Sequence, residues 1–186
     1  MRNVLIVLSG PSGVGKGTIA KLLVERNKNL SLSISCTTRG LRTGETHGKE
    51  YFFITKDEFK EKIKNDGFLE YSNHFENFYG TPKSFVLESL KEKDVLLEID
   101  VNGGLEVKKN FPEAVLIMLL PPSREEVRNR LIKRSTESLD KIELRMERID
   151  YELSKQSLYD YTVINDKLDV ALNDVEEIIN KEKNKN

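Results

Sequence analysis

One stretch near the start of the chain decides the fold, and it reads Val4-Leu5-Ile6-Val7-Leu8-Ser9-Gly10-Pro11-Ser12-Gly13-Val14-Gly15-Lys16-Gly17-Thr18. Its first five residues are a continuous apolar run rich in branched side chains, which is typical of a buried strand. Helical spacing of apolar residues follows, at Ile19, Ala20, Leu22 and Leu23. The stretch therefore predicts a strand, a glycine-rich loop and a helix, in that order.

The loop between this strand and this helix matches the phosphate-binding pattern G-x-x-x-x-G-K, which runs from Gly10 to Lys16. Glycines at these positions let successive backbone N–H groups curl around a phosphate, and the lysine adds a positive charge at the β and γ oxygens. The helix that follows favours anions at its N-terminal end. We therefore expect the triphosphate of a nucleotide to contact Gly10, Pro11, Ser12, Gly13, Val14, Gly15, Lys16, Gly17 and Thr18.

The hydroxyl of this loop comes one place later than in the common P-loop pattern, because Gly17 stands between Lys16 and Thr18. Gly-Lys-Gly-Thr is the form expected in P-loop kinases of small metabolites. A hydroxyl in this part of the loop approaches the Mg²⁺ that accompanies the nucleotide. We therefore expect Thr18 to lie near Mg²⁺.

A second predicted strand, 95–99, ends among the carboxylates Glu98 and Asp100. Carboxylates at the carboxyl end of a parallel strand face the crevice where ligands bind. Because Mg²⁺ keeps most of its waters and needs few protein ligands, Glu98 or Asp100 would hold it through water. The alternative is that these carboxylates cap the following turn at Asn102-Gly103.

Strand and helix patterns alternate along most of the chain. Apolar runs predict strands at 95–99, 114–120 and 161–164, and helical spacing predicts helices at 105–109, 123–134 and 170–179. A stripe at spacings of three and four residues predicts another helix with a core face, at Ile142, Met146, Ile149 and Leu153. An α/β fold follows, in which helices flank the parallel sheet of a P-loop core.

Between Ser35 and Thr81 the pattern changes to glycine-rich turns and short aromatic pieces that read as strands, at 51–53 and 68–71. Thr55 and Glu58 are spaced as a capping box, which predicts one helix start in this segment. Ser123 and Glu126 have the same spacing and predict the start of the helix at 123–134. We interpret 35–81 as a small mixed α/β lobe inserted in the core, since no long linker separates it.

Composition narrows the classes of function. Thirty Lys and Arg residues stand against 31 Asp and Glu, so the overall field attracts neither nucleic acid nor an anionic membrane. The single Cys36 excludes an internal disulfide, and one cysteine with two histidines is too few for a Cys/His zinc site. No apolar run approaches the roughly 18 residues of a membrane span. We expect a cytoplasmic protein with local anion sites and a frayed polar tail at 181–186.

A second anion site is predicted in the segment from Ser33 to Glu45. It carries several hydroxyls and the arginines Arg39 and Arg42, and it has no apolar stripe to bury. Arginines in such a loop suit a bidentate grip on a phosphate other than the one held by the P-loop. The alternative is a solvated loop.

With these two segments, the chain resembles guanylate kinase over nearly its whole length. The resemblance rests on the P-loop, on the Ser-x-Ser-x-Thr-Thr-Arg-x-x-Arg-x-Gly-Glu block that ends at Glu45, and on later motifs, namely Gly48-x-x-Tyr51-x-Phe53, Phe68-Leu69-Glu70, Tyr79-Gly80-Thr81, Ile99-Asp100, Pro121-Pro122-Ser123 and Val163-Ile164-Asn165-Asp166. It implies transfer of a phosphoryl group from ATP to GMP, and to dGMP, with Mg²⁺, in purine nucleotide metabolism.

The resemblance also implies where GMP binds. It assigns the GMP phosphate to Arg39, Arg42, Tyr51 and Tyr79, places Glu45 in the same site, and assigns guanine to Ser35, Glu70, Thr81 and Asp100. The chemistry of Glu70 agrees, because a carboxylate accepts from both N1–H and the N2 amino group of guanine, whereas adenine has no N1–H. Without the resemblance, Glu70 reads as an ordinary strand carboxylate.

The resemblance further implies a helical lid at about 124–149, so that the core comprises 1–34, 82–123 and 150–186 of one domain, 1–186. Arg130 and Arg134 lie four residues apart and share a helix face, while Arg145 and Arg148 flank the next apolar stripe. Arg134 and Arg145 would clamp the transferring phosphoryl group beside Lys16 and Arg39 as catalytic residues. ATP would also contact Arg130 and, through its adenine, Asn165. Without the resemblance, such arginines would indicate only the solvent-exposed face of an amphipathic helix.

Three positions depart from the family pattern, namely Leu41, Ser135 and Cys36. None of them removes a charge or an implied ligand. Ser135 replaces the usual glycine after the lid arginine and is expected to stiffen the lid, and Cys36 beside the GMP site suggests inhibition by thiol modification.

Two further readings, and the oligomeric state, stay open. One is a protein-binding module of the same fold without catalysis, and the other is a kinase specific for AMP or UMP. The P-loop argues against the module and Glu70 against the other acceptors. The sequence leaves a monomer and a homodimer equally open.

Overall fold

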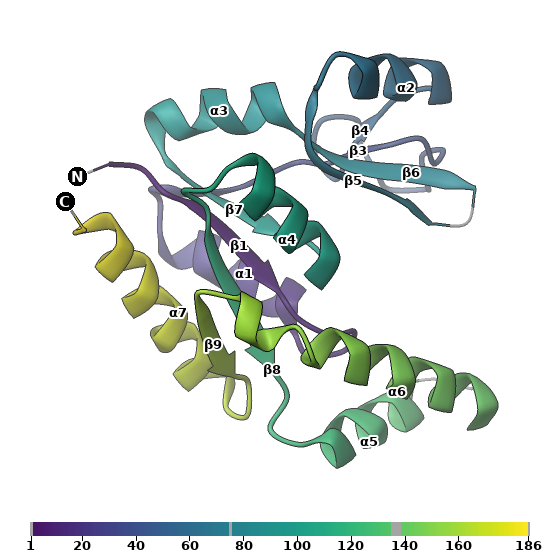
Figure 1. Cartoon of the computed structure of the whole chain (residues 1–186), viewed down its shortest axis with the longest axis vertical. Coiled ribbons are helices and arrows are strands. Elements are labelled where there is room, and N and C mark those ends of the chain that lie inside the picture. Colours follow the sequence, from purple (N-terminus) through teal and green to yellow (C-terminus); the bar gives the residue numbers. More distant parts are fainter. Residues whose placement is uncertain (1, 75, 135–138, 186) are drawn as a thin grey trace.

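The computed structural model describes residues 2–74, 76–134 and 139–185, which form two sheets and their helices (Figure 1). The larger sheet runs in the order β2 (Leu30–Leu32), β7 (Asp94–Glu98), β1 (Leu5–Ser9), β8 (Val115–Leu120) and β9 (Tyr161–Ile164). All its strand pairs are parallel. The predicted parallel P-loop sheet is confirmed, and β1, which leads into the phosphate loop, lies at its centre.

Helices cover both faces of the larger sheet: α1 (Lys16–Arg26) and α7 (Leu168–Lys183) one face, α3 (Lys83–Glu92) and α4 (Val101–Asn110) the other. All five residues of β1 are buried, and they point alternately to the two faces. Ile6 and Leu8 pack with α1 and α7, whereas Leu5 and Val7 pack with α4. This two-sided burial explains why the strand reads as an unbroken apolar run.

The smaller sheet has the order β4 (Phe52–Phe53), β3 (Cys36–Thr37), β6 (Asn77–Pro82) and β5 (Phe68–His74), with α2 (Lys56–Lys64) packed on it. Its core is aromatic: the Phe59 ring stacks on Phe68 and Phe78 at 4.4 and 5.3 Å between ring centroids. Thr55 forms the expected capping box with Glu58 at the start of α2. The segment 35–81 therefore contains strands that form a separate sheet, and a helix that packs on this sheet.

Two helices, α5 (Arg124–Arg134) and α6 (Leu139–Leu153), form an arm that projects from the core away from the smaller sheet (Figure 1). The predicted apolar stripe is confirmed as core, because Ile142, Met146 and Ile149 are buried with Val127 of α5. A short 3-10 helix, η1 (Gln156–Leu158), leads from α6 back to β9. No helix in the described part of the chain has the length and apolarity needed to cross a membrane.

The fourth helix begins earlier than the sequence suggested, at Val101 instead of 105. Asp100 caps it by accepting a hydrogen bond from the Gly103 backbone N–H at 2.8 Å. The two glycines of this turn discouraged a helix assignment. Gly104 is there for space, since a Cβ atom on it would lie 2.8 Å from Ser9 Oγ.

The first part of the carboxyl-terminal tail is held in place, which corrects the expectation that the chain frays from residue 181; residue 186 lies outside the described residues. The α7 helix continues to Lys183, whose Nζ lies 2.6 Å from Asp94 Oδ2. Asp94 is fully buried, and its other oxygen accepts a hydrogen bond from the Val4 backbone N–H at 3.0 Å. A buried acid 89 residues away thus fixes a lysine that reads as solvated in the sequence.

Replacing Lys183 with Met is expected to lower the free energy of unfolding by about 3 kcal/mol, because it leaves the buried carboxylate of Asp94 without its cation. Urea unfolding followed by circular dichroism measures the change. Lys167→Met is the control, since Lys167 is an exposed lysine at the start of the same helix. Equal effects of the two variants would show that the ion pair contributes nothing.

Candidate active site

The phosphate loop has the backbone that its glycines predict. Gly15 adopts φ 102° as it caps the start of α1, a left-handed conformation that side chains disfavour. Gly10 lies so close to β8 that a Cβ atom would meet the Leu119 carbonyl oxygen at 2.5 Å. Thr18 is exposed in the first turn of α1, where its hydroxyl is available to a ligand.

Lys16 is half-buried and folds back over its own loop. Its Nζ donates hydrogen bonds to the carbonyl oxygens of Gly10 at 2.7 Å and Pro11 at 3.2 Å. Burial lowers the pKa of Lys16, and the negative charges of three carboxylates, Glu98, Glu152 and Asp100, oppose that effect. The ammonium group is therefore influenced by acidic side chains from three segments of the chain.

Asn165, the residue directly after β9, supports the phosphate loop. Its Nδ2 donates a hydrogen bond to the Val14 carbonyl oxygen at 2.8 Å, and the side chain is buried. It also lies against Gly15, where a Cβ atom would come within 2.6 Å of Nδ2. The structure therefore shows Asn165 bracing the phosphate loop, while its contact with adenine stays a prediction.

A cavity of about 540 Å³ opens between the smaller sheet and the carboxyl end of the larger one. It is lined by seven of the nine residues predicted for GMP, namely Ser35, Arg39, Arg42, Tyr51, Glu70, Tyr79 and Asp100. Thr81 lies behind it and contacts Glu70, and Glu98 lines it as well. Sequence reasoning missed Ser72 and Asn77, which also line it.

The alternating pattern of the strand contained a signal for Ser72. Successive residues of a strand point to opposite faces, so Ser72 shares a face with Glu70. In β5 and β6 it is paired with Tyr79, itself a predicted ligand. The pairing of these two strands, which the sequence did not reveal, was needed to use that signal.

Glu70 is the buried acid of this cavity. It is 6% exposed, and its Oε1 accepts a hydrogen bond of 2.6 Å from the Thr81 hydroxyl. Burial raises the pKa of Glu70 to about 7, and the nearby charge of Asp100 adds to the rise. A carboxylate with one oxygen anchored in this way presents a fixed acceptor to the cavity.

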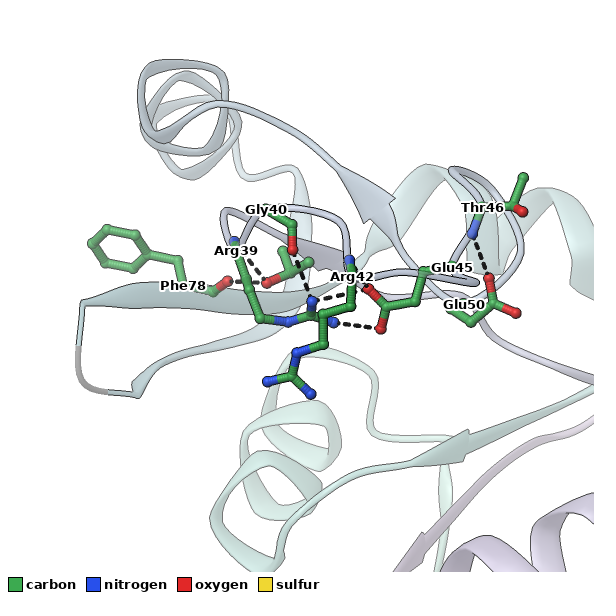
Figure 2. Close-up of polar contacts among 8 residues, drawn as sticks. Arg39, Gly40, Arg42, Glu45, Thr46, Glu50 and Phe78 are labelled. Atoms are coloured by element: carbon green, nitrogen blue, oxygen red, sulfur yellow. Dashed lines mark hydrogen bonds and ion pairs between the residues drawn. The ribbon is translucent and has the colours of Figure 1, made fainter.

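Arg39 is held by Glu45 in a bidentate ion pair (Figure 2). The two N–O distances are 2.7 and 2.9 Å, and Glu45 also accepts from the Arg42 backbone N–H at 2.8 Å. Hydrogen bonds from Arg39 lower the pKa of Glu45 to about 2. Figure 2 shows the Arg42 guanidinium pointing away from this carboxylate. Glu45 thus orders the two arginines and is not among the residues that line the cavity.

Glu45→Gln is expected to raise KM for the phosphate acceptor about tenfold, because a small displacement of Arg39 misaligns its grip on phosphate. Steady-state kinetics measures this change, with KM for ATP expected to stay constant. Glu50→Gln is the control, since Glu50 is a nearby exposed loop carboxylate that accepts from the Thr46 backbone N–H (Figure 2) and lies 4.0 Å from Lys49 Nζ. An unchanged acceptor KM in Glu45→Gln would refute the ordering role.

The two carboxylates at the end of β7 have different positions. Asp100 caps α4, so the capping alternative holds for it, and it also lines the cavity. Glu98 is exposed and lies beside the loop, such that a Cβ atom on Gly17 would be 3.4 Å from its Oε1. The arrangement therefore leaves Glu98 better placed than Asp100 to face the phosphate loop.

The arginines predicted for the lid are described only in part. Arg145 and Arg148 are exposed on α6, and Arg148 Nε lies 3.2 Å from Glu152 Oε1. The side chains of Arg130 and Arg134 on α5, and Ser135 altogether, lie outside the described residues. The clamp formed by Arg134 and Arg145 thus stays a prediction.

Cys36 is not the reactive group that the sequence suggested. It is 2% exposed and packs in the aromatic core of the lobe with Phe59 and Phe68. Burial raises the pKa of its thiol to about 11. Because the thiolate is the form that reacts, the folded protein shields this cysteine from alkylation.

Comparison with known proteins gives one consistent match. The sequence model of the guanylate kinase family matches residues 2–182. A guanylate kinase of Caldanaerobacter subterraneus subsp. tengcongensis is 53% identical over 98% of this chain and 89% of its own, and one of Clostridium tetani is 50% identical over 98% and 88%. The crystal structure of guanylate kinase from Anaplasma phagocytophilum superposes with a TM-score of 0.77 and 31% identity, over 99% of this chain and 88% of that one.

Proposed function

This chain belongs to the guanylate kinase family, and from that membership we propose that it transfers the γ-phosphoryl group of ATP to GMP, and to dGMP. The products with GMP are ADP and GDP. The observation that carries the proposal is the cavity, which combines Arg39 and Arg42 with the buried acid Glu70 next to a phosphate loop. A nucleoside monophosphate with a guanine base matches both kinds of group.

The acceptor half of the site recognises the two ends of GMP. Arg39 and Arg42 bind its phosphate together with Tyr51 and Tyr79, whose rings lie 6.0 Å apart at the same wall. Glu70 accepts hydrogen bonds from guanine N1–H and from the N2 amino group, and Thr81 keeps its carboxylate in place. Adenine lacks the N1–H donor, so AMP would leave this buried acid unpaired.

The donor half works by position and charge. Lys16 moves from the loop carbonyls to the β and γ oxygens of ATP, and Arg134 and Arg145 close over the transferring group. The GMP phosphate is already an anionic nucleophile, so the reaction needs no protein group to remove a proton. Closure of lobe and lid excludes water, which would otherwise hydrolyse ATP.

Mg²⁺ is the metal that these residues fit. In the described part of the chain no three His, Cys, Asp or Glu side chains gather into a metal cage. Mg²⁺ needs no such cage, since it binds phosphate oxygens and keeps several waters. Thr18 and, through water, Glu98 or Asp100 would hold it beside the phosphates, where its charge offsets theirs.

The test is the formation of ADP from Mg·ATP with GMP, dGMP, AMP and UMP supplied separately. We expect rapid turnover with GMP and dGMP and little with AMP or UMP. Rapid turnover with AMP alone would overturn the acceptor assignment. No turnover with any acceptor would instead favour a protein-binding module.

A further inference from the structure

Gly103 lies directly behind the buried acid that is proposed to read guanine. It belongs to the first turn of α4, three residues after the capping residue Asp100. A Cβ atom on Gly103 would lie 3.3 Å from Glu70 Oε2 and 3.5 Å from Asp100 Oδ1. Since the first of these distances is shorter than ordinary van der Waals contact, any side chain at position 103 would press on the Glu70 carboxylate.

The Glu70 carboxylate has little room to yield to such an atom. Its other oxygen, Oε1, accepts the 2.6 Å hydrogen bond from the Thr81 hydroxyl, and the side chain is 6% exposed. Asp100 is fixed as well, because its Oδ1 accepts from the Gly103 backbone N–H at 2.8 Å. The position of the Glu70 carboxylate therefore depends on the space that the glycine leaves.

The contact between Glu70 and Gly103 joins the two sheets of the molecule. Glu70 and Thr81 belong to the smaller sheet, in β5 and β6, whereas Gly103 belongs to a helix that covers the larger sheet. The last residue of the same helix also holds β5, because Asn110 Nδ2 donates a hydrogen bond of 2.7 Å to the Leu69 carbonyl oxygen. The α4 helix thus contacts β5 both at the acid and at the residue before it.

We propose that Gly103 is a positioning residue for Glu70, and that its lack of a side chain contributes to the selectivity of the cavity for guanine. The glycine lets α4 pack behind the carboxylate without displacing it from Thr81. A displaced carboxylate would no longer meet both guanine donors, which need hydrogen bonds of defined length and direction. This effect on the acceptor rests on the proposed function, whereas the close contact itself does not.

The first test is Gly103→Ala, which adds the one carbon atom in question. KM for GMP is expected to rise about tenfold while KM for ATP stays unchanged, and the preference for GMP over AMP in kcat/KM is expected to fall by the same factor. The midpoint of urea unfolding is expected not to fall, because alanine favours a helix more than glycine does. A lowered midpoint together with raised KM values for both substrates would indicate a packing defect and overturn the proposal.

Asn102→Ala is the matched control, since it changes the exposed residue beside Gly103 in the same helical turn. Its KM for GMP is expected to stay within about twofold of the wild type. An equal rise in both variants, or an unchanged KM for GMP in Gly103→Ala, would overturn the proposal.

The second test asks whether Gly103 acts through Glu70, by a double-mutant cycle with Glu70→Gln in which calorimetry measures the affinity for GMP. In the Glu70→Gln background, Gly103→Ala is expected to cause less than about a twofold further loss, since the acceptor that it displaces has already been removed. Additive losses would show that the added carbon obstructs the ligand directly, and would overturn the positioning role. A wild-type protein that neither binds nor phosphorylates GMP would instead reject the proposed function, and the selectivity role of Gly103 with it.

Discussion

Lys16→Met is expected to slow phosphoryl transfer to GMP by about a thousandfold, with GMP affinity nearly unchanged. Removal of a single preorganised charge at a developing anion has effects of this order. Lys16 already lies over the loop, bonded to the carbonyl oxygens of Gly10 and Pro11, so it needs only a short movement to reach the phosphates. Rapid-quench measurement of GDP formation gives the rate, and calorimetry with GMP gives the affinity.

Lys21→Met is the matched control for this prediction. Lys21 belongs to the same helix, but it is exposed and its contact with Glu25 is a weak pair at 3.9 Å. We expect its rate to stay within about twofold of the wild type. If Lys16→Met lost GMP affinity as strongly as rate, the lysine would belong to the acceptor site and the division into two half-sites would be wrong.

Glu70→Gln is expected to reduce kcat/KM for GMP by about a hundredfold while KM for ATP stays unchanged. The amide offers its oxygen to only one guanine donor and presents an NH₂ group where an acceptor is needed, at a buried position. Glu70 is 6% exposed and bonded to Thr81, so it has little freedom to rearrange. Steady-state kinetics with GMP and AMP measures both the loss and the selectivity.

The pH dependence of GMP binding distinguishes the titration of Glu70 from the titration of the GMP phosphate. Because the pKa of Glu70 is raised to about 7, the acceptor form is lost as the pH falls through that value, and GMP affinity is expected to fall with it. The Glu70→Gln variant shows only the titration of GMP itself. A wild-type pH profile of GMP affinity parallel to that of Glu70→Gln would contradict this account. Glu92→Gln, which changes an exposed carboxylate, is the control for the kinetic loss. An equal kinetic loss in that variant would also contradict the account.

Most elements of the larger sheet could be predicted because their signals are local. The apolar run before the P-loop, the capping pair Thr55–Glu58 and the stripe through Met146 each depend on neighbours in the chain. The α3 helix and strand β2 were missed, and β6 was represented only by its motif. The β2 strand has only three residues, and Val86 is the one buried residue of α3, so local patterns are weak and tertiary contacts decide the structure of these segments.

Within the candidate site, residue types and spacing predicted which groups bind anions, but not how those groups are held. Glu45 was assigned to GMP, whereas the structure shows it bonded to Arg39 and to the Arg42 backbone. Asn165 was assigned to adenine, and it bonds to Val14. Both contacts join groups whose relative position depends on the folded backbone, which no spacing rule supplies.

By itself, the sequence determined that a strand, a phosphate loop and a helix begin an α/β fold, and it predicted that a second, arginine-bearing segment binds another phosphate. Only the tertiary structure decided which acids of the described residues are buried, namely Glu70, Asp94, Glu152 and Glu182. In the sequence these four look like any other carboxylates. Burial depends on residues far apart in the chain, and it is burial that raises the pKa of Glu70 and of Glu152 and holds Lys183 at Asp94.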